Sequence, residues 1–136
     1  MSNKSSGAKF EREFGSYLSN CGFWVHILQD NRNGQPFDII AVKNGNAYAI
    51  DCKVCEGRRF YLNRMEPNQI SAMRLWGECG NTNAVFAVYF QHAKQICLMD
   101  CYQLLRIKEQ GIKSLDVEQA KELSMRICGY GTDNQQ

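Results

Sequence analysis

This chain of 136 residues has no long apolar run, few prolines and a small net charge. No run is long and apolar enough to span a membrane, and the polar residues 1–7 do not resemble a secretory signal. We therefore expect a cytoplasmic protein with no membrane partner. If the gene is viral, the protein would act in the cytoplasm of the host cell. The net charge of +2 is too small to indicate nucleic-acid binding by itself. With 44% hydrophobic residues, the chain can form one compact domain with a core.

Cysteine, by contrast, is abundant, with seven residues. Cys52 and Cys55 have the C-x-x-C spacing and Cys97 and Cys101 are four residues apart, so a zinc or iron-sulfur site built from these four is one interpretation. Cys52 and Cys97 lie in apolar, strand-like runs, and an odd number of cysteines argues against a full disulfide framework. We expect buried, reduced thiols at these positions.

A β-hairpin is predicted in the middle of the chain. Residues 37–42 and 47–53 are rich in branched and aromatic side chains, and the Asn44-Gly45 pair between them tolerates positive φ. This pattern predicts two antiparallel strands joined by a tight turn. The strands are apolar enough to be buried on at least one face of a sheet.

Two carboxylates and an ammonium group meet at one end of this hairpin. Positions symmetric about the turn pair with each other, so Asp38 lies roughly opposite Asp51, and alternation along the strand puts Lys53 on the same face as Asp51. Like charges at that distance repel unless a cation lies between them, and Mg2+ prefers oxygen ligands with several retained waters. This arrangement is typical of a Mg2+-dependent phosphodiester nuclease. Charges at exposed strand ends also serve solubility alone, which is the alternative interpretation.

A helix with a further carboxylate is predicted upstream of the hairpin. Apolar side chains recur at helical spacing from Phe10 to Leu18, and Glu11 borders this apolar stripe. Residues 23–28 follow as a first strand. Glu11 is otherwise an ordinary surface charge, so its candidacy depends on the hairpin carboxylates.

The remaining pattern completes an α/β fold with a mixed, mainly antiparallel sheet flanked by helices. It predicts a helix over 67–76, strands over 84–90 and 95–99, and short helices over 102–108 and 116–123. We expect a single domain over 1–136, with a core at about 7–100, a C-terminal helical extension at about 101–128 and a frayed tail at 129–136.

Four segments in this order resemble a known family: residues 7–13, 21–23, 36–41 and 49–53. They are similar to the PD-(D/E)xK nuclease superfamily, and most similar to the Holliday junction resolvases, both the archaeal type and those of Gram-positive bacteria. The resemblance covers about residues 7–100. It implies a restriction-endonuclease-like core in the order αβββαβ. In the family a proline often directly precedes the first aspartate, whereas here Phe37 stands between Pro36 and Asp38.

The resemblance implies a role for each candidate catalytic residue. Glu11 would help to place metal-bound water, while Asp38, Asp51 and the backbone carbonyl of Cys52 would ligate the metal. Lys53 would orient or activate the attacking water. The implied cofactor is Mg2+, with Mn2+ as a substitute.

Gln69 matches a glutamine that lies near the active site in this family, on the helix after the hairpin. An ordinary polar residue in the first turn of a helix is an equally good interpretation.

Local basic residues favour contacts with DNA phosphates. The candidates are Arg58, Arg59 and Arg64, which follow the D-x-K, together with Lys9 and Arg32. A charged loop can equally be only a solvated connection. The polar, turn-rich residues 29–36 are expected to form a mobile loop. One interpretation is that it closes over a DNA strand, and the alternative is a plain strand connection, although it is somewhat long for that.

The sequence therefore predicts a Mg2+-dependent, structure-selective DNA endonuclease that resolves four-way (Holliday) junctions in recombination and repair. Symmetrical cutting of a four-way junction requires two active sites, so we expect a homodimer. Candidate dimer contacts, which could equally be loop anchors, are Phe60, Tyr61, Leu62 and Met65. One alternative is another nuclease of this superfamily, of the nicking, flap, restriction-like or single-strand kind. The other is a noncatalytic nucleic-acid-binding or inhibitor module on the same fold.

Overall fold

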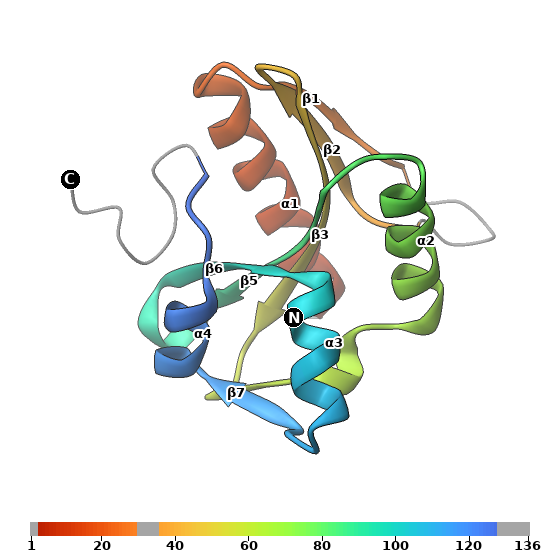
Figure 1. Ribbon diagram of the computed structural model, residues 1–136. Helices are drawn as coiled ribbons and strands as arrows, with labels where there is room; N and C mark the ends of the chain where they lie inside the picture. The colour runs from red at the N-terminus through yellow and green to blue at the C-terminus, as the bar shows by residue number, and fades with distance from the viewer. Residues whose placement is uncertain (1–2, 30–35, 128–136) are drawn as a thin grey trace.

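The computed structural model describes residues 3–29 and 36–127 (Figure 1). Nearly all of the loop expected at 29–36, including Arg32, and the whole tail expected at 129–136 lie outside these ranges. Among the described residues, no helix is long and apolar enough to cross a membrane.

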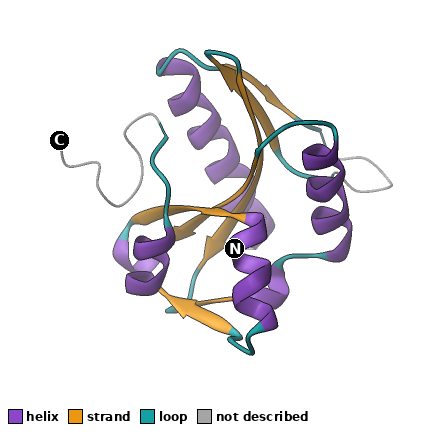
Figure 2. Cartoon of the chain, in the orientation of Figure 1, coloured by secondary structure: helices purple, strands orange, loops and turns teal. Residues whose placement is uncertain are grey.

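A five-stranded sheet forms the centre of the fold (Figure 2). In spatial order its strands are β1 (Trp24–Ile27), β2 (Ile39–Lys43), β3 (Asn46–Cys55), β5 (Asn83–Phe90) and β6 (Gln95–Asp100). The β3 and β5 strands run parallel, and every other neighbouring pair is antiparallel. The predicted mixed, mainly antiparallel sheet is confirmed.

Helices cover both faces of the sheet and bury one hydrophobic cluster on each. The helices are α1 (Asn3–Asn20), α2 (Pro67–Glu78), α3 (Cys101–Glu109) and α4 (Val117–Leu123). On one face Phe14 and Leu18 of α1 pack with Ile50 of β3. On the other, Met73 of α2 and Leu104 of α3 pack with a separate set of sheet residues. Because alternate strand residues face opposite clusters, each central strand is apolar on both faces.

The α1 helix has the apolar stripe that its sequence predicts. Phe10, Phe14 and Leu18 recur every four residues and are buried against the sheet. The helix ends where Gly22 adopts a left-handed φ of 94°, and Phe23 donates its backbone N–H to the carbonyl of Leu18. This ending turns the chain directly into β1.

The predicted hairpin is present, with β3 longer than expected. Asn44 and Gly45 have positive φ values of 54° and 81°, the geometry of a tight hairpin turn. The β2 strand pairs with β3 only from the turn to Ile39 opposite Ile50, whereas β5 pairs with β3 as far as Cys55. Among the described residues, no strand pairs with this side of β3 over residues 51–55, which we call the open edge of β3.

A small ribbon outside the main sheet was not predicted. The β4 strand (Arg59–Tyr61) pairs with β7 (Ser114–Asp116), so the C-terminal extension is not purely helical. Strands of three residues are too short to show a period in the sequence. Asp116 also caps α4, because its carboxylate accepts the backbone N–H of Gln119 at 2.8 Å.

The ribbon and the turn after it anchor the chain to the core. Phe60, Leu62 and Met65 are at most 2% exposed, whereas Tyr61 is 52% exposed. Three of the four candidate dimer contacts are therefore loop anchors within the protomer.

The four cysteines considered as metal ligands are free and buried: Cys52, Cys55, Cys97 and Cys101. Within residues 3–29 and 36–127, no three His, Cys, Asp or Glu side chains are grouped so that they could hold a metal ion. The zinc or iron-sulfur interpretation therefore has no support in the described part of the chain. Cys21, in contrast, is disulfide-bonded.

Two glycine-to-alanine substitutions should have opposite effects on stability. A Cβ on Gly77 would lie 2.6 Å from the hydroxyl of Tyr102, so Gly77→Ala displaces the Tyr102 ring from its place between α3 and α2 and should lower the free energy of unfolding by about 1 kcal/mol. A Cβ on Gly7 of α1 meets nothing within 4 Å, so Gly7→Ala should raise it by about 0.5–1 kcal/mol. Urea unfolding measures both. Equal effects of the two substitutions would contradict the close packing of α2 on α3.

Candidate active site

Asp51 and Lys53 lie side by side at the open edge of β3. Both project from the face covered by α2, because Cys52 and Val54 between and after them belong to the cluster under α1. The Nζ of Lys53 lies 3.2 Å from Oδ2 of Asp51, and the two side chains are 10% and 2% exposed. The D-x-K spacing thus forms a buried ion pair.

Asp38 reaches the same place from the residue before β2. Its backbone N–H donates to the carbonyl of Ile50 at 2.9 Å, which continues the β2–β3 ladder by one bond. Its Oδ2 then accepts the backbone N–H of Cys52 at 2.7 Å. The carboxylate of Asp38 therefore replaces a strand partner at the point where β2 has ended.

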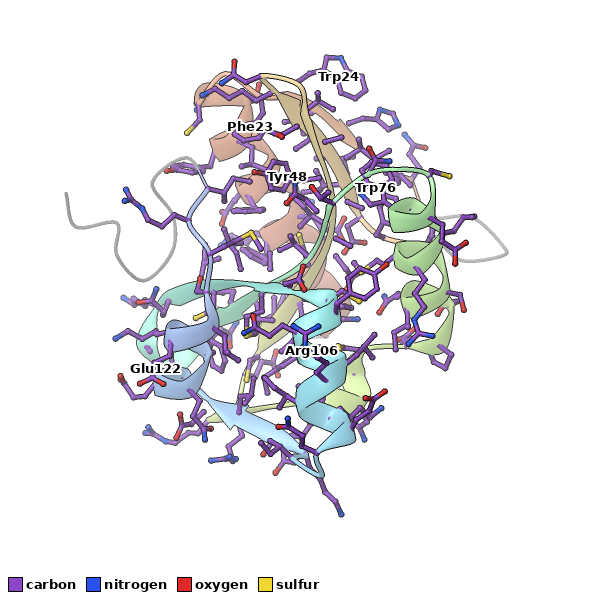
Figure 3. The ribbon with its side chains drawn as sticks, viewed as in Figure 1. Phe23, Trp24, Tyr48, Trp76, Arg106 and Glu122 are labelled. Carbon is purple, nitrogen blue, oxygen red and sulfur yellow. The ribbon has the colours of Figure 1, made fainter. Side chains whose placement is uncertain are left out.

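The segment before Asp38 is held by α2. Phe37 is buried, and its ring packs edge-on against Trp76 with centroids 5.8 Å apart. The indole N–H of Trp76 donates to the carbonyl of Asn83 at 3.0 Å, so this ring is fixed between α2 and β5 (Figure 3). The sequence analysis missed this role of Trp76, and a tryptophan late in an amphipathic helix was its only signal.

Gln69 connects the start of α2 to Asp51. As the third residue of the helix it completes a capping box, in which its Oε1 accepts the backbone N–H of Glu66 at 3.1 Å. Its Nε2 donates to Oδ1 of Asp51 at 3.0 Å. Because the cap uses the amide oxygen, the amide nitrogen is turned toward the carboxylate. Gln69 is therefore both a polar residue in the first turn of α2 and a hydrogen-bond donor to Asp51.

Burial makes the charge on Asp51 unfavourable. Desolvation first, and then the nearby charge of Asp38, raise the pKa of Asp51 from 3.8 to about 8, although Lys53 opposes the shift. Oδ2 of Asp51 is buried, and the positive group beside it is the ammonium of Lys53 at 3.2 Å. With Asp38 also close enough to raise the pKa of Asp51, the two carboxylates form a buried, negatively charged pair that a further cation would stabilise.

The residues at this edge fit a Mg2+ ion better than a zinc ion. Mg2+ is commonly held by one or two carboxylates and keeps several waters, so Asp38 and Asp51 suffice without a third charged ligand. The backbone carbonyl of Cys52 points to the same open edge, because Cys52 donates its N–H there to Asp38 and a residue's N–H and C=O point the same way.

Glu11 lies on α1, half-buried, within electrostatic reach of this edge. Its charge contributes, after burial and the charges of Asp38 and Asp51, to raising the pKa of the buried Cys52 thiol. It does not form a three-residue ligand group with the two aspartates in the described part of the chain. Its expected role through a water is compatible with that placement.

The arginines near the site differ in how many contacts they make within the protein. Arg59 donates to the hydroxyl and carbonyl oxygens of Ser114 and pairs with Asp116, so it braces the β4–β7 ribbon. Arg64 donates to the carbonyl of Val54 at 2.8 Å and stacks over Phe60. These two predicted DNA contacts are engaged within the protein.

Two other predicted DNA contacts are exposed. Arg58 forms no hydrogen bond or ion pair with any described residue, and Lys9 makes a loose pair with Glu13 at 4.0 Å. Arg32 lies outside the described residues.

Comparison with known proteins identifies one family and one fold. The family model described as archaeal Holliday junction resolvase (hjc) matches residues 2–130. Among solved structures, the chain is similar to that of Archaeoglobus fulgidus Hjc, a Holliday junction resolvase from an archaeal hyperthermophile. The match has a TM-score of 0.64 and 17% identity, and covers 88% of this chain and 94% of that one. It shows the restriction-endonuclease-like fold. No curated protein matches the chain.

The raised pKa of Asp51 should make the metal-free protein less stable as pH rises. The folded state keeps a proton that the unfolded chain releases above pH 3.8, so the free energy of unfolding falls between about pH 4 and pH 8 and then levels off. The slope from this group is at most about 1.4 kcal/mol per pH unit. Asp51→Asn should flatten this decline, whereas Glu109→Gln, at an exposed position on α3, should retain it.

Urea unfolding in EDTA at pH 5, 6.5 and 8 measures these slopes. An identical slope in wild type and Asp51→Asn would show that Asp51 ionises normally.

Proposed function

This chain belongs to the archaeal Holliday junction resolvase family, and from that premise we propose that it is a Mg2+-dependent endonuclease that cuts four-way DNA junctions. The observation that supports this proposal most strongly is the group formed by Asp38, Asp51 and Lys53 at the open edge of β3. It combines two buried carboxylates and an ammonium group on a strand edge along which, in the described part of the chain, no other strand pairs.

Each residue of the group has a distinct part in phosphodiester hydrolysis. Asp38 and Asp51, with the backbone carbonyl of Cys52, would hold the metal. When bound, Mg2+ or Mn2+ supplies positive charge for the phosphoryl oxygens and acidifies water. Lys53 orients the attacking water and stabilises the negative charge that develops on the phosphate. Glu11 helps to place that water from the side of α1.

Gln69 acts on the reaction through Asp51. Its amide nitrogen donates to Oδ1, so that Oδ2 faces the ammonium of Lys53 at 3.2 Å and a cation would share this oxygen with Lys53. Gln69 thereby fixes the rotation of the carboxylate, because its own orientation is set by the cap of α2.

DNA contacts would come from exposed cations around the open edge. Arg58 and Lys9 are available to phosphates, and we propose Arg32 as a further contact. Arg59 and Arg64 would contribute chiefly by holding the ribbon and the open edge in place.

We further propose that the whole chain acts as one nuclease domain and as a homodimer. Both core clusters lie on the two faces of the same sheet, which favours a single domain. A dimer supplies the second active site that symmetrical cutting needs. Of the contacts considered from the sequence, Tyr61 is exposed, and Trp24 and Leu75 are exposed elsewhere, at 62% and 60%.

The proposed function predicts paired nicks in a branched substrate. Wild-type protein with Mg2+ should cut a labelled immobile junction on opposing strands and leave the matching linear duplex intact. Asp51→Asn should abolish cutting. Lys53→Met should slow cutting by about 10²–10⁴-fold while junction affinity changes by less than about twofold, because Lys53 acts on the reacting groups. Glu109→Gln serves as the unaffected control.

Two results would contradict this proposal. Cutting of linear duplex alone at a short sequence would indicate a restriction-like enzyme. Tight junction binding without cleavage in Mg2+ or Mn2+ would indicate a noncatalytic module.

Metal binding should be visible in thermal stability without any DNA. Mg2+ at about 100 times its dissociation constant should stabilise EDTA-treated wild type by about 2.7 kcal/mol, and so raise its melting temperature by several degrees. Asp38→Asn and Asp51→Asn should each lose most of this increase, while Glu109→Gln keeps it. An equal shift in all four proteins would place the metal elsewhere.

A further inference from the structure

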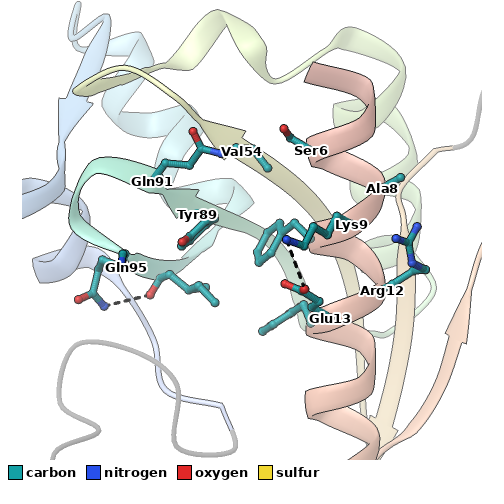
Figure 4. A pocket seen from close by; sticks show the side chains of 13 residues that line it. Ser6, Ala8, Lys9, Arg12, Glu13, Val54, Tyr89, Gln91 and Gln95 are labelled. Carbon is teal, nitrogen blue, oxygen red and sulfur yellow. Dashed lines mark hydrogen bonds and ion pairs between the residues drawn. The ribbon is translucent and has the colours of Figure 1, made fainter. Parts of the chain in front are cut away.

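A groove lies away from the carboxylates, between α1 and the connection of β5 to β6 (Figure 4). It is an open groove of about 960 Å³, which we call the α1 groove. Lys9, Phe10 and Glu13 line it from α1, and Tyr89, Gln91 and Lys94 line it from the sheet side. None of the proposed catalytic residues is part of its lining.

The groove is nevertheless adjacent in the chain to the proposed active site. Phe10 and Val54 both line it, and each directly neighbours a proposed catalytic residue, Glu11 and Lys53. The groove lies on the α1 face of the sheet at the end of β3. Asp51 and Lys53 lie at the same end of β3 but project from the opposite face. The open edge of β3 separates them, and no strand covers that edge in the described residues.

Aromatic rings form part of the groove wall. Phe10 and Tyr89 stack with centroids 5.6 Å apart and an interplanar angle of 27°. Phe10 is buried, whereas Tyr89 is half-buried and so keeps part of its ring open to the groove. A fixed, partly exposed ring is a surface on which a nucleic-acid base can stack.

The groove is also positively charged. Its lining contains three basic residues, Lys9, Arg12 and Lys94, and one acidic residue, Glu13; without Arg12, which points away from the groove, the net charge of the lining is +1. Figure 4 shows Lys9 on the groove side of α1, while Arg12 projects from the other side of the helix. The pair of Lys9 with Glu13 is exposed and 4.0 Å long, so it restrains the lysine little.

Lys94 occupies an unusual backbone position. It has a left-handed φ of 50° after the 3-10 turn Gln91–Ala93, and its side chain is exposed. Glycine or asparagine suits this conformation better than lysine does. The exposed side chain of Lys94 lies at the rim of the groove with its charge available to a phosphate.

We propose that the α1 groove binds a single-stranded segment of the DNA substrate, such as unpaired nucleotides at a branch point. Lys9 and Lys94 would contact phosphates, and Tyr89 would stack on a base. Duplex DNA fits these observations less well, because its bases are already stacked on each other and cannot use an aromatic wall. This inference rests on the proposed function for its substrate, since a strand cut at the open edge of β3 would continue past α1 into the groove.

Binding of a labelled 20-nucleotide oligothymidine in EDTA tests the groove without catalysis. By fluorescence anisotropy, Lys94→Glu should weaken binding by at least about fivefold and reduce the dependence of log affinity on log salt by about 0.7 for each lost phosphate contact. Tyr89→Leu, which keeps an apolar side chain but removes the ring, should weaken binding by at least about fivefold. Lys108→Glu makes the same charge change at an exposed position on α3 outside the groove and should bind within about twofold of wild type.

The outcomes separate this inference from the proposed function. Groove variants that bind the oligothymidine like Lys108→Glu, or a wild type that does not bind it, would overturn the inference even if junctions are cut. Binding that depends on Lys94 and Tyr89 would support it even if no junction is cut, in which case only the proposed function fails. Urea unfolding of each variant is measured in parallel, and if Tyr89→Leu is unstable the exposed Lys94→Glu decides.

Discussion

The site depends on the cost of holding two carboxylates together out of water. Asp38 and Asp51 are 7% and 2% exposed, and neither would be stable there without partners. The protein supplies a backbone N–H to Asp38, and an amide N–H and a neighbouring ammonium to Asp51. One oxygen of Asp51 is still left without a hydrogen bond. The two carboxylates are therefore only partly compensated within the folded chain, which is the electrostatic basis of the proposed metal site.

The topology of the sheet creates the open edge at which the two carboxylates lie. Because β3 pairs with β5 over its whole C-terminal half but loses β2 after Ile50, a central strand becomes an edge strand for five residues. The capped first turn of α2 places Gln69 against β3. Near the other end of α2, the ring of Trp76 packs against Phe37, the residue before Asp38, and so helps to position that aspartate. One helix thus positions both carboxylates.

Local sequence patterns were sufficient for the hairpin, α1 and the main sheet, because apolar period and the Asn44-Gly45 turn are properties of neighbouring residues. They were not sufficient for the β4–β7 ribbon, whose strands are 55 residues apart and three residues long. The same limit explains the arginines: nothing near Arg59 in the sequence shows that Ser114 will occupy its guanidinium. The α1 groove, formed by residues from the chain's first helix and from β5 and β6, had no linear signature at all.

The contact of Arg64 with the open edge of β3 also affects how this edge can bind other molecules. An uncovered strand edge is a template on which another polypeptide can add, the first step of sheet-mediated aggregation. On this edge the N–H of Cys52 is already bonded to Asp38 and the carbonyl of Val54 to Arg64. An incoming peptide strand would find these two ladder positions taken, whereas a phosphate, which needs no such ladder, would not be hindered. The guanidinium of Arg64 thus helps the protein to keep an accessible strand without self-association through it.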